Sequence, residues 1–170
     1  MTDNALTRWF LKRFGKIASK IIAYYNRPKL INPHENRGIT GSCQMGAGCH
    51  MQPGVVIDCT GDITIGEDCL FIRGCRLMTH SHAYLKGRPD QINVLHPIVR
   101  TKKTVGDHVF VGQDALVLPQ CQEIGDYAII GARAVVTRNV GANEIWAGNP
   151  ARKVGERSDE SDIGLEIAGD

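Results

Sequence analysis

Aromatic residues, closely paired cysteines, long apolar runs and net charge are all scarce in this sequence. Aromatic residues make up only 6% of the 170 residues, which disfavours a helical bundle with a large aromatic core. No Cys-x-x-Cys pair occurs, and no long apolar run follows Met1. We therefore expect no disulfide framework, no secretory signal and no membrane-spanning helix, and hence a cytoplasmic protein. A formal net charge of +2 gives no indication of a nucleic-acid partner.

Glycine is abundant, with 19 residues, and it recurs within a six-residue pattern. Each hexad begins with an apolar, mostly aliphatic side chain, often followed by glycine, and a small side chain stands fifth. The first positions are Ile39, Met45, Met51, Ile57, Ile65, Phe71, Leu77, Val105, Val111, Val117, Ile124, Ile130 and Val136. About a dozen hexads in register predict an all-β solenoid, a triangular parallel β-helix with both of these positions inward. We expect the second-position glycines to stand at corners that need unusual backbone dihedrals.

The hexads also account for most of the cysteines. Only Cys59 falls outside the frame, and the other five stand at the fifth position: Cys43, Cys49, Cys69, Cys75 and Cys121. We interpret these five as small hydrophobic side chains that face the interior, rather than as metal ligands or disulfide partners.

Three segments depart from the repeat. Residues 1–28 place apolar side chains at helical spacing with Arg and Lys between them, which predicts a basic amphipathic helix. This helix caps the open end of the coil or packs on another subunit, or residues 4–25 contact an anionic membrane surface. Residues 79–104 are a polar insertion in the repeat domain, residues 29–155, and such insertions are where solenoids place function. Residues 156–170 are acidic, and we expect a flexible tail.

Several stretches of the sequence resemble the hexapeptide-repeat acetyltransferases, and more narrowly the maltose, galactoside, nodulation-factor and polysaccharide O-acetyltransferases. These stretches are residues 65–82, 105–112, 130–140 and 147–152. The resemblance implies a left-handed parallel β-helix, acetyl-CoA as co-substrate, and a homotrimer with active sites between subunits. Phe110 stands where the family usually has tryptophan.

By this resemblance, His82 falls on the family's catalytic histidine. A neutral imidazole can take the proton of a hydroxyl as the hydroxyl attacks the acetyl thioester directly, without a covalent enzyme intermediate. The family usually has proline after this histidine, whereas Ala83 follows here, so His80 is a rival for the role of base. We expect His80 to point to the opposite face of an extended segment, because side chains alternate there.

The same resemblance designates residues for both substrates. Gln52 aligns with an asparagine that contacts the acceptor in sugar acetyltransferases. Arg138 and Arg152 have the charge to meet phosphate groups. The positions that contact CoA in the family are occupied by Gln113, Ala132, Thr137, Arg138 and Arg152.

The function we expect is acetyl transfer to a hydroxyl of a carbohydrate, such as a sugar, a lipopolysaccharide or an exopolysaccharide unit. A streptogramin- or chloramphenicol-type O-acetyltransferase and a sugar-nucleotide N-acetyltransferase remain open. A γ-class carbonic anhydrase is less favoured, because it binds metal through three histidines and has one where Gln113 stands, so we expect no metal requirement. A non-catalytic β-helix scaffold is disfavoured by His82 and by the CoA-type C-terminal residues.

Overall fold

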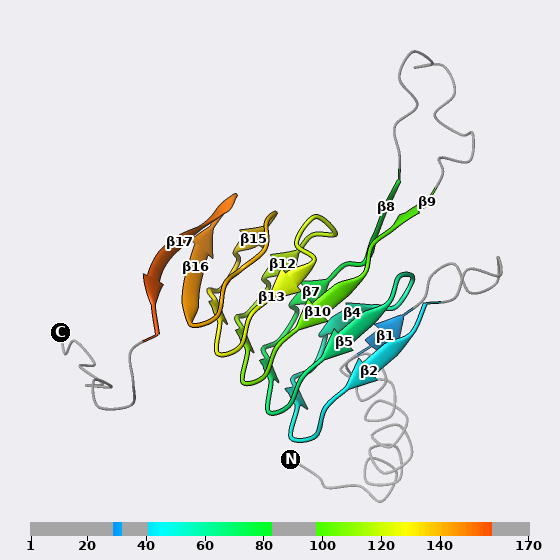
Figure 1. Cartoon of the computed structure of the whole chain (residues 1–170), viewed down its shortest axis with the longest axis horizontal. Coiled ribbons are helices and arrows are strands. Elements are labelled where there is room, and N and C mark those ends of the chain that lie inside the picture. The colour runs from blue at the N-terminus through cyan, green and yellow to red at the C-terminus, as the bar shows by residue number, and fades with distance from the viewer. Residues whose placement is uncertain (1–28, 32–40, 83–97, 158–170) are drawn as a thin grey trace, which may run out of the picture.

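The computed structural model describes residues 29–31, 41–82 and 98–157, and these residues form short strands joined by tight corners (Figure 1). The predicted N-terminal helix, residues 1–28, lies outside the described residues, as does most of the predicted acidic tail. The strands are β1 (Lys29–Ile31), β2 (Cys43–Met45), β3 (His50–Met51), β4 (Val56–Asp58), β5 (Ile63–Ile65), β6 (Leu70–Phe71), β7 (Arg76–Leu77), β8 (His80–His82), β9 (Ile98–Arg100), β10 (Lys103–Val105), β11 (Phe110–Val111), β12 (Leu116–Val117), β13 (Glu123–Ile124), β14 (Ile129–Ile130), β15 (Val135–Val136), β16 (Glu144–Gly148) and β17 (Ala151–Glu156).

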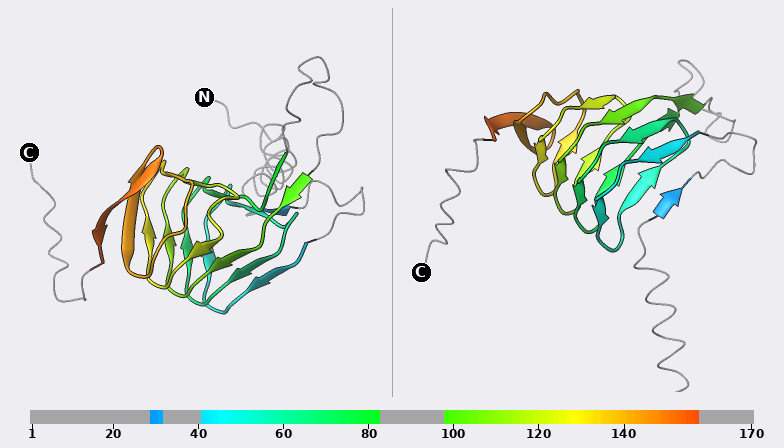
Figure 2. Two further views of the ribbon diagram at one scale, coloured as in Figure 1. Left: turned by 45° about the horizontal axis from the view of Figure 1, so that its top comes forward. Right: turned by 60° about the horizontal axis from the view of Figure 1, so that its bottom comes forward.

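Three sheets form the three faces of a coil (Figure 2). Sheet A has the order β1-β4-β7-β12-β15, sheet B has the order β13-β10-β5-β2, and sheet C has the order β17-β16-β14-β11-β6-β3. Every pairing in these sheets is parallel except the last, between β16 and β17. The chain passes from sheet B to C to A in each turn, so the predicted parallel β-helix is confirmed.

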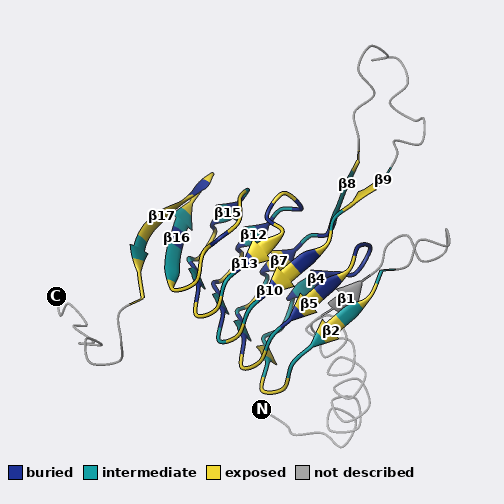
Figure 3. Ribbon diagram, viewed as in Figure 1, coloured by how far each residue is buried: buried dark blue, intermediate teal, exposed yellow. Residues whose placement is uncertain are grey.

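The interior of the coil is filled by the two hexad positions that were predicted to face inward (Figure 3). First-position residues such as Ile57, Phe71 and Val111 have no exposed surface. Three of the fifth-position cysteines are buried, and the other two, Cys43 and Cys49, are half-buried and pack against the core. The interpretation of these five cysteines as interior packing residues is therefore confirmed.

The prediction that second-position glycines supply unusual dihedrals is wrong. Within the hexads the left-handed backbone occurs at the fourth position, at Gly48, Gly54, Asp68, Gly74, His108, Asp114, Tyr127 and Arg133, and positive φ angles occur near the C-terminal end at Asn143 and Gly148. The second-position glycines are needed for space, because stacked coils approach each other closely there. A Cβ on Gly66 would lie 2.7 Å from the carbonyl carbon of Gly106, and a Cβ on Gly112 would lie 2.6 Å from the nitrogen of Ala132.

Irregularities in the hexad frame all fall at the corner where the chain passes from sheet A to sheet B, which we call corner AB. Ile57 and Ile65 are separated by eight residues instead of six, and Val117 and Ile124 by seven. The insertion leaves the coil at the same corner, between β7 and β10. Its described ends, β8 and β9, form an antiparallel pair that extends away from the coil (Figure 1).

Lys103 begins β10 and is almost fully buried, with 1% of its surface exposed. Its Nζ donates hydrogen bonds to the carbonyl oxygens of Leu118 and Cys121, which lie in the next layer of corner AB. Burial lowers the pKa of Lys103 from 10.5 to about 8, and the nearby Cys121 thiol only partly opposes this shift. The lysine is thus mostly charged at neutral pH inside the coil, which costs stability.

Because its folded-state pKa is depressed, Lys103 predicts a pH-dependent stability. The cost of the buried charge is present in full below pH 8 and is relieved as the pH rises from about 8 towards 10.5. We expect the free energy of unfolding at pH 9, measured in urea, to exceed that at pH 7 by roughly 1 kcal/mol more in the wild type than in Lys103→Met. The exposed neighbour Lys102 provides the control variant Lys102→Met. A Lys103→Met protein that kept the wild-type pH dependence would contradict this assignment.

Candidate functional site

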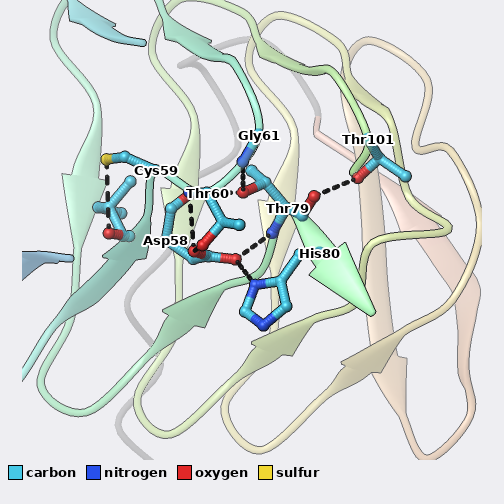
Figure 4. A network of polar contacts seen from close by, with 8 residues as sticks. Asp58, Cys59, Thr60, Gly61, Thr79, His80 and Thr101 are labelled. Carbon is cyan, nitrogen blue, oxygen red and sulfur yellow. Dashed lines mark hydrogen bonds and ion pairs between the residues drawn. The ribbon is translucent and has the colours of Figure 1, made fainter. Parts of the chain in front are cut away.

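Corner AB holds all four buried polar or charged side chains of the described residues: Asp58, Thr60, Thr79 and Lys103. Elsewhere the described interior is apolar. Three of these residues, Asp58, Thr60 and Thr79, belong to two successive layers of the corner and form one hydrogen-bonded network (Figure 4). No buried side-chain nitrogen or oxygen in the described part of the chain lacks a hydrogen-bond partner.

Asp58 stands at the centre of this network, fully buried at the end of β4. Its Oδ1 accepts hydrogen bonds from the Thr60 backbone nitrogen at 3.0 Å and from Thr60 Oγ1 at 2.6 Å. Its Oδ2 accepts one from the Thr79 backbone nitrogen at 2.8 Å and lies 2.6 Å from Nδ1 of His80. Burial alone would raise the pKa of Asp58, but the hydrogen bonds from Thr60, Thr79 and His80 together lower it. Asp58 is therefore a carboxylate held by four donors.

Thr79 joins the two layers of the corner. Its Oγ1 donates to the Asp58 carbonyl oxygen at 2.8 Å and accepts from the Gly61 nitrogen at 2.9 Å. Its own carbonyl oxygen accepts hydrogen bonds from the nitrogen and Oγ1 of Thr101, at 2.8 and 3.0 Å. Both ends of the insertion are thus fixed to the coil at Thr79, directly before His80.

The two histidines of β8 lie on the same face, with ring centroids 5.6 Å apart in an edge-to-face arrangement. The prediction that His80 points to the opposite face is wrong, because residues two apart along a strand share a face. The His80 side chain is largely enclosed, with 10% of its surface exposed, whereas His82 is exposed. Arg100 lies opposite His80 across the β8–β9 pair, so its side chain belongs to the same face.

A pocket of about 290 Å³ lies at the foot of the β8–β9 pair. Its lining residues are Gly41, Thr60, Gly61, Asp62, Arg100, Thr101 and Lys102, and three of them belong to the network around Asp58 and Thr79. Asp62 accepts hydrogen bonds from the nitrogen and Oγ of Ser42 at 3.0 and 2.9 Å. Neither Arg100 nor Lys102 forms an ion pair with another described residue. The pocket therefore combines threonine and backbone donors with two cations, which also act on the Asp62 carboxylate in its lining.

The structure distributes the other predicted site residues over different parts of the coil. Gln52, Gln113 and Ala132 lie where the chain passes from sheet C to sheet A, which we call corner CA. There Gln52 Oε1 accepts a hydrogen bond from the Arg73 nitrogen at 3.1 Å. Within one chain these three residues are therefore on a different corner from His80 and His82.

Thr137, Arg138 and Arg152 lie towards the C-terminal end of the coil. Thr137 and Arg138 follow β15 at corner AB, on the same edge as the histidines but two layers further along. Arg152 is exposed on β17, where its Nη1 donates to the Ala151 carbonyl oxygen at 2.8 Å. The residues next to Arg138, from Asn139 onward, line a second hollow of about 430 Å³ along sheet B.

Asp58 and Arg100 are the residues of this site that the sequence did not point out. The available signal was the two-residue slip of the frame after Ile57, since an irregular corner directly below the insertion can hold polar side chains. Within the described ranges, no group of three or more His, Cys, Asp and Glu side chains is arranged to hold a metal ion. Among the same residues, no helix is long and apolar enough to span a membrane.

Comparison with known proteins relates the sequence to acetyltransferases. No protein-family model matches the chain. It is 39% identical over 61 residues to a chloramphenicol acetyltransferase of Agrobacterium fabrum, covering 36% of this chain and 29% of the relative. It is 32% identical over 97 residues to the acetyltransferase WcaF of Escherichia coli (strain K12), whose name assigns it to colanic acid biosynthesis, covering 57% of this chain and 49% of the relative. The chain thus spans less than half the length of these relatives.

Comparison with solved structures identifies the fold. The hexapeptide-repeat acetyltransferase VCA0836 of Vibrio cholerae O1 biovar eltor, solved with acetyl-CoA, superposes with a TM-score of 0.60 at 24% identity, covering 69% of this chain and 61% of that one. The coil described above is therefore a left-handed parallel β-helix of the kind found in hexapeptide-repeat proteins, as predicted.

Proposed function

We propose that this chain, which has the fold of the hexapeptide-repeat acetyltransferases, transfers an acetyl group from acetyl-CoA to a hydroxyl of a carbohydrate. The observation that carries the proposal is that two imidazoles lie on β8, whose partner strand β9 contributes Arg100 to a polar pocket, at the corner where the repeat is interrupted. The similarity to acetyltransferases, one of them solved with acetyl-CoA, supports the donor. The similarity to WcaF, whose name assigns it to colanic acid biosynthesis, supports the acceptor class.

The reaction needs no covalent intermediate on the protein. The acceptor oxygen attacks the thioester carbonyl carbon while a histidine of β8 takes its proton; the resemblance designates His82 for this role. The tetrahedral intermediate then collapses, the carbon–sulfur bond breaks, and the CoA thiolate takes the proton back from the imidazolium. Arg138 and Arg152 supply charges that suit CoA phosphates. We place the reaction in the cytoplasm, where acetyl-CoA is available.

We also propose that the active unit is a homotrimer. Gln52, Gln113 and Ala132 lie on corner CA, away from the histidines of the same chain. A neighbouring copy that presents its corner CA to corner AB would bring the residues for the acceptor and for CoA to the histidines. Such an arrangement would account for matches to the family's site positions on two separate corners.

An acetyl-CoA consumption assay tests the function. Purified protein is supplied with acetyl-CoA and a panel of mono- and oligosaccharides, with chloramphenicol included because one relative acetylates it by name. We expect CoA release with at least one carbohydrate, and an increase in the thermal unfolding midpoint when CoA is added. Turnover with chloramphenicol alone would favour the antibiotic alternative, and no turnover with any acceptor would reject the proposal.

The pocket beside the histidines predicts a preference for anionic acceptors. Arg100 and Lys102 can form charge-assisted hydrogen bonds with a phosphate or carboxylate group on the carbohydrate, each worth roughly 1.5–3 kcal/mol. We therefore expect the double variant R100Q/K102Q to raise KM for a sugar phosphate or uronic acid by about tenfold or more, with KM for acetyl-CoA unchanged. Arg76→Gln, an exposed arginine on β7 outside the pocket, is the control. An equal change for neutral sugars would contradict the assignment.

A further inference from the structure

We propose that Asp58 and His80 form the catalytic pair of the transferase, with His80 as the general base and Asp58 as the residue that positions it. This inference rests on the proposed acetyl transfer and changes the residue that carries out its proton transfer. It departs from the sequence-based designation of His82, and it gives a role to a buried carboxylate that no resemblance pointed out.

The first step of the argument is the protonation state of the His80 ring. Asp58 accepts two hydrogen bonds at Oδ1 from Thr60 and one at Oδ2 from the Thr79 nitrogen. These bonds keep the carboxyl ionised, and an ionised carboxylate can only accept hydrogen bonds. At 2.6 Å from Oδ2, Nδ1 of His80 must therefore carry a proton and donate it. In the neutral ring, Nε2 is then the nitrogen with a lone pair, which is what a base requires.

The second step is the rigidity of the pair. Thr79 precedes His80 directly, and its backbone nitrogen and Oγ1 both bond to Asp58. Thr79 and Asp58 lie in stacked layers of the coil. The position of His80 is therefore set by the coil rather than by the pairing of β8 with β9. His82 is two residues further along β8 and exposed, and its ring contacts that of His80. A ring held in one orientation by a buried carboxylate at one nitrogen is well placed to act as a base at the other.

The third step is the charge balance of the reaction. As the acceptor oxygen forms its bond to the thioester carbon, its proton passes to Nε2 of His80, and the ring becomes an imidazolium. The carboxylate of Asp58 lies against the other nitrogen and compensates this positive charge. When the carbon–sulfur bond breaks, the CoA thiolate takes the proton from Nε2, and the pair returns to its starting state. Arg100, on the same face as His80, orients the acceptor from the pocket.

Matched single variants separate His80 from His82. His80→Asn keeps a donor near the position of Nδ1 and removes Nε2, and His82→Asn makes the same change at the neighbouring position. With acetyl-CoA and the best acceptor of the panel, we expect His80→Asn to lower kcat by roughly 10²–10⁴-fold, with KM for acetyl-CoA within about twofold of the wild type. We expect His82→Asn to lower kcat by less than about tenfold.

Asp58→Asn tests the positioning role. Its amide can donate to Nδ1 and so favours the wrong tautomer, and we expect kcat to fall about as far as in His80→Asn. The fall should appear in kcat rather than in KM for acetyl-CoA, and the nitrogen-15 NMR shifts of the His80 ring should change from the Nδ1-protonated tautomer in the wild type to the Nε2-protonated tautomer in Asp58→Asn. If Asp58→Asn does not fold, the matched variants His80→Asn and His82→Asn still decide which ring is the base.

The outcomes distinguish this inference from the function on which it rests. Loss of kcat in His82→Asn with activity kept in His80→Asn would overturn the inference and leave acetyl transfer intact. A wild-type His80 with its proton on Nε2 would overturn it too. A wild-type protein that transfers acetyl to no acceptor would instead reject the proposed function.

Discussion

The double variant H80A/H82A is expected to lower kcat by roughly 10²–10⁴-fold, whichever of the two histidines takes the proton. Both imidazoles of β8 are lost, and no other histidine of the described residues lies at corner AB. The activity that remains should reflect the binding and orientation of the two substrates, which other residues provide. Steady-state kinetics with the best carbohydrate of the panel measures the effect.

Two controls accompany the double variant. Ser81→Ala changes the residue between the histidines, on the opposite face of β8, and should leave kcat within about twofold. The rise in thermal midpoint with CoA should persist in H80A/H82A, because the predicted CoA residues lie on corner CA or in later layers of the coil. Unchanged turnover in the double variant would remove histidine base catalysis from the proposed mechanism.

Phe71→Ala is expected to destabilise the coil by about 3–5 kcal/mol. Phe71 has no exposed surface and stacks between Met51 and Val111 in sheet C. It is the largest fully buried side chain of the described residues, so its truncation leaves a cavity that adjacent strands of two residues cannot close. Domains of this size have a total free energy of unfolding of roughly 5–15 kcal/mol. The variant would therefore lose a large part of its stability and unfold at a lower temperature.

Urea unfolding of the variant and of an exposed aromatic control measures this effect. Tyr127 is 42% exposed, and Tyr127→Ala should cost at most about 1 kcal/mol. Similar losses in the two variants would mean that Phe71 is not the packing centre of its layer.

Most of the fold could be predicted because the same hexad pattern recurs in every layer, and each copy predicts the same three-sided turn. A residue such as Val111 occupies the same place in its layer as Phe71 and Ile130 do in theirs, so one rule explains all three. The role of glycine could not be predicted in the same way. Close approach of stacked backbones depends on the neighbouring coil, which the sequence does not show, whereas a left-handed residue such as Asp68 or His108 has no glycine to reveal it.

The candidate site was predicted only in part, for a similar reason. The resemblance drew attention to His82, and the spacing of His80 and His82 was sufficient to place both rings on one face. Asp58 lies 22 residues before His80, and only the stacking of one layer on the next brings them together. Lys103 lies near the end of the polar insertion, and the sequence around it gives no indication that this charged side chain is buried.

The pairing of strands across the insertion has a consequence for how such a protein can change over evolutionary time. Ile65 pairs with Val105, and Leu77 with Val117, as directly as in layers without an insertion. The segment between Thr79 and Thr101 can therefore be lengthened, shortened or exchanged without disturbing the stacking of the layers. On the proposed function, the part of acceptor selectivity that depends on β8 and β9 can diverge separately from donor recognition, for which the predicted residues lie on the coil. On the proposed function, we expect the corresponding segment of a relative, grafted between these two threonines, to bring part of that relative's acceptor preference to this chain.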